Sequence, residues 1–143
     1  MNSSVLDRDL GFSQLLRDLE ALEDVEVEVG IFDGEIAEYA AANEFGTDTI
    51  PPRPFMSTAA DENREKYSSM AEAQSARVSR GQTSLAAAAS AIGIEARNDQ
   101  IRSIQDGDWE PNAPSTIARK GSSRPLVDTG AMQRAITFRV KGK

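Results

Sequence analysis

Carboxylates are the side chains of this sequence that could perform acid–base chemistry. They recur at close spacing in three places: Glu35 with Glu38, Glu44 with Asp48, and Asp106 with Asp108 and Glu110. A pair of carboxylates can cleave a glycosidic bond when one of them lies in a cleft that raises its pKa. These acids instead fall in turns and on polar faces of expected helices. We therefore predict no catalytic residue, with a carboxylate-dependent hydrolase of cell-wall glycans as an alternative.

The composition excludes most other reaction chemistry. The 143 residues include no Cys and no His, which removes thiol nucleophiles, disulfide bonds, imidazole bases and the usual ligand sets of zinc, copper and iron. The sequence from Asp106 to Asp108 is similar to the start of a calcium-binding loop, but the later ligand positions of such a loop are not filled. Glycine-rich phosphate loops of the usual spacing are absent as well. We therefore expect no metal site and no cofactor.

Charge is distributed unevenly along the chain. The net charge is −7, yet residues 1–48 hold 13 acids and 2 bases, whereas residues 112–143 hold 1 acid and 7 bases. An acidic chain with one basic end argues against nucleic acid as the main partner, because phosphate binding needs a concentrated basic surface. The split favours subunits that meet acidic face to basic face. Pairing of the two ends within one chain is the competing explanation.

The elements that must position these side chains follow from the spacing of apolar residues. Apolar and polar residues alternate over 25–32 and again over 136–141, which is the period of a strand with one solvated face. Helical spacing predicts four longer helices, at about 11–23, 35–45, 58–80 and 83–105. Thr58 with Asp61 is the expected capping pair at the start of the third helix, and Thr83 or Ser84 is the expected cap of the fourth helix.

One domain over residues 1–143 is the expected organisation, with an α+β fold. The two strands should form a small antiparallel sheet, packed with several helices. Their solvated faces would then place Glu26 and Glu28 against Arg139 and Lys141. A short helix over 131–135, capped by Asp128 or Thr129, should precede the last strand. The run 86–89 of alanines allows close backbone approach, although high helix propensity alone also explains it.

Two irregular stretches are harder to explain as scaffold alone. Residues 50–55 hold three prolines, which cannot lie inside a helix and which stiffen the chain around Arg53 and Phe55. Stiff segments lose little entropy on binding, and Arg and aromatic residues are favoured interface anchors. A docking segment and a rigid crossover with Phe55 in the core are both consistent with this pattern. The second stretch, 107–136, is rich in bases, Gly and Pro, and long irregular loops are commonly functional.

Together these stretches resemble a known family. The pattern comprises, in order, Val29-Gly30; Tyr39-Ala40 with Asn43-Glu44-Phe45-Gly46-Thr47; Ile50-Pro51-Pro52-Arg53-Pro54-Phe55; Gly107 with Trp109 and Pro111; Thr116-Ile117 with Lys120-Gly121; and Pro125-Leu126-Val127-Asp128-Thr129-Gly130 with Met132 and Ile136. It is similar to the tail-completion (neck) proteins of long-tailed bacteriophages and covers residues 25–140. Residues 57–105 carry no motif of that family.

The resemblance implies roles for particular residues. Arg53, Phe55, Trp109, Lys120 and Arg124 would contact neighbouring proteins. The structural motif would comprise Gly30, Glu44, Gly46, Pro52, Pro54, Asp128, Thr129 and Gly130. No catalysis is implied.

The resemblance also implies an assembly. The subunit would form a homo-oligomeric ring at the head–tail junction of the virion, next to head-closure and tail-terminator or tail-tube proteins, with DNA passing through without sequence-specific binding. A tail-terminator or head-closure ring is the alternative role. The protein would be made in the host bacterial cytoplasm, and no apolar run reaches the roughly 20 residues of a membrane span.

Overall fold

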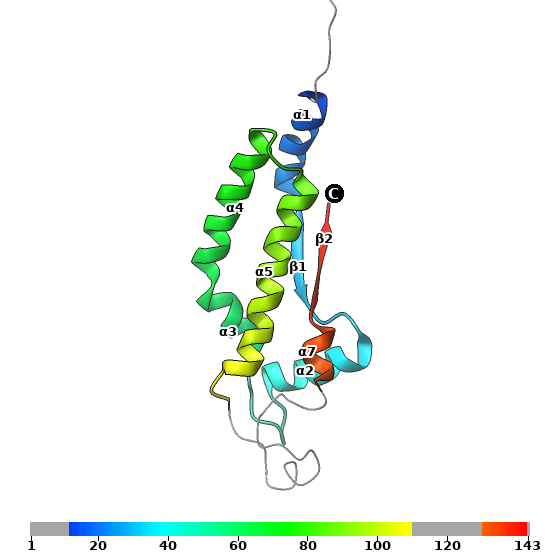
Figure 1. The fold of residues 1–143 in the computed structure, drawn as a ribbon. Helices are drawn as coiled ribbons and strands as arrows, with labels where there is room; N and C mark the ends of the chain where they lie inside the picture. Colours follow the sequence, from blue (N-terminus) through cyan, green and yellow to red (C-terminus); the bar gives the residue numbers. More distant parts are fainter. Residues whose placement is uncertain (1–11, 110–129, 143) are drawn as a thin grey trace, which may run out of the picture.

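The computed structural model describes residues 12–109 and 130–142, and Figure 1 shows the course of the chain. The helices are α1 (Phe12–Ala21), η1 (Leu22–Asp24, a 3₁₀ turn), α2 (Gly34–Phe45), α3 (Phe55–Glu62), α4 (Arg64–Ser79), α5 (Leu85–Asp106) and α7 (Ala131–Ala135). The strands are β1 (Glu26–Gly30) and β2 (Thr137–Lys141). None of the helices in these described ranges is long and apolar enough to cross a membrane.

The expected α+β fold and its small sheet are confirmed. β1 pairs with β2 antiparallel, with Glu26 opposite Lys141 and Glu28 opposite Arg139. The Glu28 carboxylate accepts from Arg139 Nε at 2.6 Å and lies 2.7 Å from Lys141 Nζ. Hydrogen bonds from Lys141 and then Arg139 hold the pKa of Glu28 below its usual value. Opposite charges from the two ends of the chain therefore meet within one subunit and help to set the strand register.

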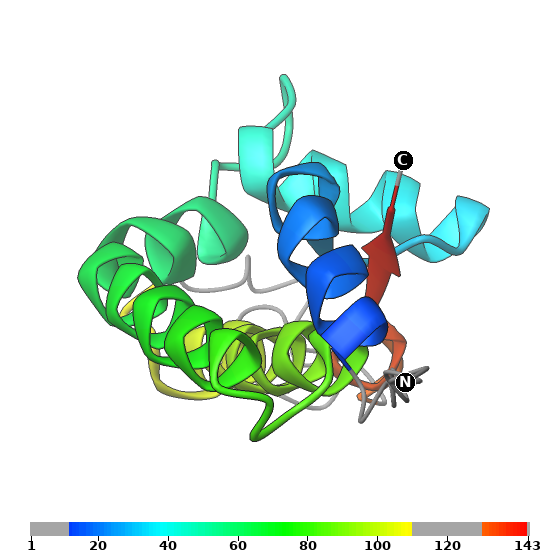
Figure 2. The same ribbon diagram turned by 90° about the horizontal axis from the view of Figure 1, so that it is seen from above.

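Helix α5 is the element on which the others pack. It lies against both strands on one side and against α4 on the other, as Figure 1 shows. In Figure 2, seen from above, α4 and β2 lie on different sides of the molecule. Ser84, one of the two caps that the sequence offered, caps α5 by accepting the N–H of Ala87. Gly93 faces the sheet, and a Cβ at this position would overlap the ring of Phe138. Ala88 and Ala89 are buried, so part of the alanine run does serve close packing.

Two helix boundaries differ from the sequence-based expectation. The predicted helix 58–80 is wrong, because it is two helices, α3 and α4, separated at Asn63. The first of these begins at Phe55, three residues before the proposed cap at Thr58, because a carboxylate from α2 satisfies its first N–H groups. The short helix α7 begins after Gly130, which holds a left-handed conformation with φ 73° and makes no side-chain cap. Asp128 and Thr129, the expected caps, lie outside the described residues.

The main core lies where α2, α3, α5 and α7 come together. Phe55 and Ile136 are its largest fully buried side chains, and Ala40, Ile104 and Met132 complete the cluster. Ile31, Met56 and Trp109 pack against it. This core fixes the segment between α2 and α3, which carries the family-like pattern.

Candidate functional site

The strap, residues 46–54 between α2 and α3, is held in one conformation by its backbone. Gly46 ends α2 with φ 76°, and its N–H donates to the carbonyl of Ala42 at 2.9 Å. A Cβ on Gly46 would lie 3.0 Å from the Pro52 ring, so the left-handed turn and the close approach both require glycine. Thr47 then closes a tight turn, since its Oγ1 accepts the N–H of Ile50 at 3.0 Å. Pro52 itself is exposed.

Arg53 fastens the strap to α2 instead of facing solvent. Its backbone N–H donates to the carbonyl of Asn43 at 2.5 Å, and its Nη1 donates to Asn43 Oδ1 at 3.2 Å. Only 6% of Arg53 is exposed. The expectation that Arg53 is a surface anchor is therefore wrong for this chain, because its guanidinium has a partner inside the subunit.

Glu44 joins the same unit by capping α3 across the strap. Its carboxylate accepts the N–H of Met56 at 2.9 Å and of Ser57 at 3.0 Å, and it also accepts the Ser57 hydroxyl. Pro54, the residue before α3, offers no side-chain cap. A buried carboxylate at the amino end of a helix accepts from the unpaired N–H groups of the first turn and interacts favourably with the helix dipole. Glu44 is thus a structural residue whose partners lie 12 and 13 positions away.

The other predicted site residues are divided between the core and the undescribed part of the chain. Phe55 is fully buried, so the rigid-crossover interpretation holds and its role as a contact residue is wrong. Trp109 is half-buried, and its indole N–H donates to the carbonyl of Ser103 at 2.8 Å. Gly30 ends β1 beside Met56. Lys120 and Arg124 lie outside the described residues.

The burial of Arg53 leads to a prediction about stability. Arg53→Ala should lower the free energy of unfolding by about 2 kcal/mol, because Asn43 would lose a charged hydrogen-bond donor. Urea unfolding monitored by circular dichroism measures this difference. Arg64→Ala is a suitable control, since that arginine is exposed and pairs with Asp61 on the surface. Equal midpoints for the two variants would contradict the structural role of Arg53.

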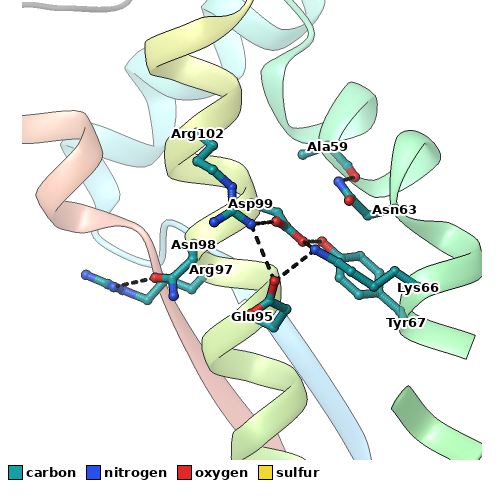
Figure 3. Close-up of polar contacts among 9 residues, drawn as sticks. All are labelled: Ala59, Asn63, Lys66, Tyr67, Glu95, Arg97, Asn98, Asp99 and Arg102. Atoms are coloured by element: carbon teal, nitrogen blue, oxygen red, sulfur yellow. Dashed lines mark hydrogen bonds and ion pairs between the residues drawn. The ribbon is translucent and has the colours of Figure 1, made fainter. Parts of the chain in front are cut away.

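A second feature is a charged groove of about 590 Å³ between α3, α4 and the carboxyl half of α5. Asp99 lies in its wall with a side chain that is 3% exposed. Tyr67 donates to it at 2.7 Å, Lys66 Nζ lies at 2.6 Å, and Arg102 pairs with its other oxygen. The carboxylate of Glu95 forms ion pairs with both Lys66 and Arg102, as Figure 3 shows.

The electrostatics of this network do not suit acid catalysis. Burial by itself would raise the pKa of Asp99, but bonds from Lys66, Tyr67 and Arg102 outweigh it and hold that pKa below its usual value. The pKa of Glu95 is lowered as well, mainly by its bond from Lys66. A glycosidase acid needs the opposite shift. Within residues 12–109 and 130–142, no three acidic side chains are grouped to hold a metal ion.

A third feature is an apolar groove of about 350 Å³ at the end of β1. Its walls come from β1 and the residues that follow it, from α2, and from the start of α3: Val29, Gly30, Ile31, Phe32, Ala37, Ala40, Ala41, Glu44, Phe45 and Met56. Phe45 is 79% exposed and Phe32 is 40% exposed. An aromatic side chain this exposed, beside a groove of apolar side chains, is typical of an interaction site.

Sequence reasoning missed several of these residues. Asn43 and Phe45 stand in the family-like pattern, but neither was singled out. The spacing of Glu95, Asp99 and Arg102 places all three on one helix face and could have indicated the network. Nothing in the sequence pairs that face with Lys66 and Tyr67, because the contact depends on how α4 packs on α5.

Comparison with protein-family models, with curated proteins and with solved structures gave no match to this chain.

Proposed function

We propose that this protein is a structural subunit of the neck of a long-tailed phage, a tail-completion protein that assembles in a ring at the head–tail junction. The observation that carries the proposal is the arrangement of the strap. Residues 43–55 of the family-like pattern form one unit, in which Asn43, Glu44, Arg53 and Phe55 face inward and fasten it. Phe45, in the middle of the same pattern, faces solvent.

This arrangement suits assembly better than catalysis. A segment already held by buried hydrogen bonds loses little conformational entropy when a partner docks, so more of the contact energy becomes affinity. An exposed aromatic side chain supplies the kind of anchor that dominates interface energetics. The lowered pKa values of Asp99 and Glu95 in the charged groove remove support from the hydrolase alternative.

The protein would then lie in the virion, where the ring would surround the DNA channel. Its contacts would be further copies of itself and the head-closure and tail-terminator or tail-tube proteins on either side. No chemical step is required of it. The net acidic chain would let DNA pass without adhering, because like charges repel.

Electron microscopy of particles that lack this protein tests the proposal. We expect DNA-filled heads beside unattached tails, because the joining ring would be missing. Adding purified protein should then join the two. Separate incubation with isolated tails and with filled heads distinguishes this role from a tail-terminator or head-closure role, which would bind one of them alone. Normal virions without the protein would refute the proposal.

A further inference from the structure

The apolar groove has open space, and Phe45 in its wall is 79% exposed. Phe32 is 40% exposed, and the guanidinium of Arg139 lies over its ring at 4.0 Å from the ring centroid. Phe45 lies in the last turn of α2, Phe32 follows β1, and both line the groove. Gly46 ends α2 with a left-handed turn directly after Phe45. The groove is therefore a preformed apolar surface.

The chain segment that supplies most of the groove carries negative charge, while Arg139 from β2 lies over Phe32. Residues 31–50 hold five acids and no base. Glu44 is used internally, but Asp33, Glu35, Glu38 and Asp48 are exposed on α2 and the strap. Asp33 and Glu35 also stabilise the start of α2, whereas Glu38 and Asp48 lie further along the chain, beyond that first turn. A ligand of this surface should combine apolar and basic groups.

The chain itself contains one segment with that chemistry. Residues 117–127 hold Ile117, Leu126 and Val127 together with Arg119, Lys120 and Arg124, and no acid. Elsewhere in the basic third of the chain, Arg139 and Lys141 already pair with Glu28.

We propose that the apolar groove of one subunit binds segment 117–127 of a neighbouring copy. The inference rests on the proposed ring for its biological context. The apolar side chains of the segment would contact Phe45 and Phe32, and its bases would face the acids of α2 and the strap. The groove and the segment are different surfaces, so the contact is heterologous and repeats from copy to copy, as a ring requires.

Self-association of the purified full-length chain tests the inference without any phage particle. Phe45→Ser should weaken self-association at least tenfold in sedimentation velocity, because interface energy concentrates in exposed aromatic anchors. Ile94→Ser is the matched control, since Ile94 is 50% exposed on α5 and does not line the groove. It should associate as the unchanged protein does. Equal weakening by both variants, or by neither, overturns the proposal. Unchanged melting of Phe45→Ser establishes that the variant is folded.

A charge exchange identifies the occupant. Glu38→Lys alone and Lys120→Glu alone should each reduce self-association severalfold, by like-charge repulsion across the contact. Mixing the two variants should restore association, because each altered surface then meets a complementary one on another chain. If the mixture associates no better than either variant alone, Glu38 and Lys120 do not meet across the contact and the proposal is overturned.

The outcomes for this contact and for the neck function remain separate. If the chain assembles normally with Phe45→Ser, the inference fails while the neck function stands or falls on the particle experiment. If the unchanged chain does not self-associate, the inference fails too. Joining of heads and tails by a non-associating protein would still support the neck function.

Discussion

Glu44→Ala is expected to lower the free energy of unfolding by about 3 kcal/mol, because two backbone N–H groups and a hydroxyl lose a charged acceptor. The N–H groups of Met56 and Ser57 begin α3, and neither Pro54 nor Thr58 can replace the carboxylate there. The melting temperature should fall by about 10 °C for a domain of this size. Differential scanning calorimetry measures both quantities.

Glu38→Ala is the control for this experiment. Glu38 lies on the same helix, is exposed, and should change the unfolding free energy by less than about 0.5 kcal/mol. Glu44→Gln should fall between the two, since one amide oxygen still accepts while the amide nitrogen opposes the N–H donors. If Glu44→Ala were as stable as Glu38→Ala, the carboxylate would not be what begins α3 at Phe55.

Asp99→Asn is expected to cost about 3 kcal/mol at neutral pH, because it removes the buried charge that Lys66, Tyr67 and Arg102 surround. Lys66 and Arg102 are partly exposed and can turn to Glu95 or water, which keeps the cost from being larger. Glu62→Gln, an exposed acid in the same groove, should change stability little.

The pH dependence of this difference has a definite sign. Since the folded pKa of Asp99 lies below its usual value, its ionised form stabilises the native state, and that contribution is complete above the unfolded pKa. The gap between the unchanged protein and Asp99→Asn should therefore stay constant from about pH 7 to about pH 5. The gap should narrow as the pH falls through the usual pKa of an unfolded aspartate, about 3.9, and towards the lower folded pKa. A gap that widened on acidification would contradict the assignment.

The sequence alone determined the features that depend on local spacing and on charge. Alternation at 25–32 and 136–141 predicted both strands, because the period is a property of neighbouring residues. The opposite charges on their solvated faces predicted that the strands pair antiparallel. A cap at Thr83 or Ser84 could be predicted, since the Ser84 hydroxyl and the N–H of Ala87 that it accepts are only three residues apart. Likewise, Gly46 predicted the turn that ends the helix, and the prolines of the strap predicted a stiff segment.

Tertiary structure decided which side chains of that stiff segment face inward. Arg53 and Phe55 are residue types that commonly anchor interfaces, but Arg53 bonds to Asn43 and Phe55 is buried in the core. Phe45 is the aromatic residue that is exposed instead. The start of α3 was likewise invisible locally, because its cap is Glu44, on another helix and more than ten residues away. Asp99 gained its partners only when α4 packed on α5. Burial and partner choice are set by contacts between distant segments, and no local period in the sequence encodes them.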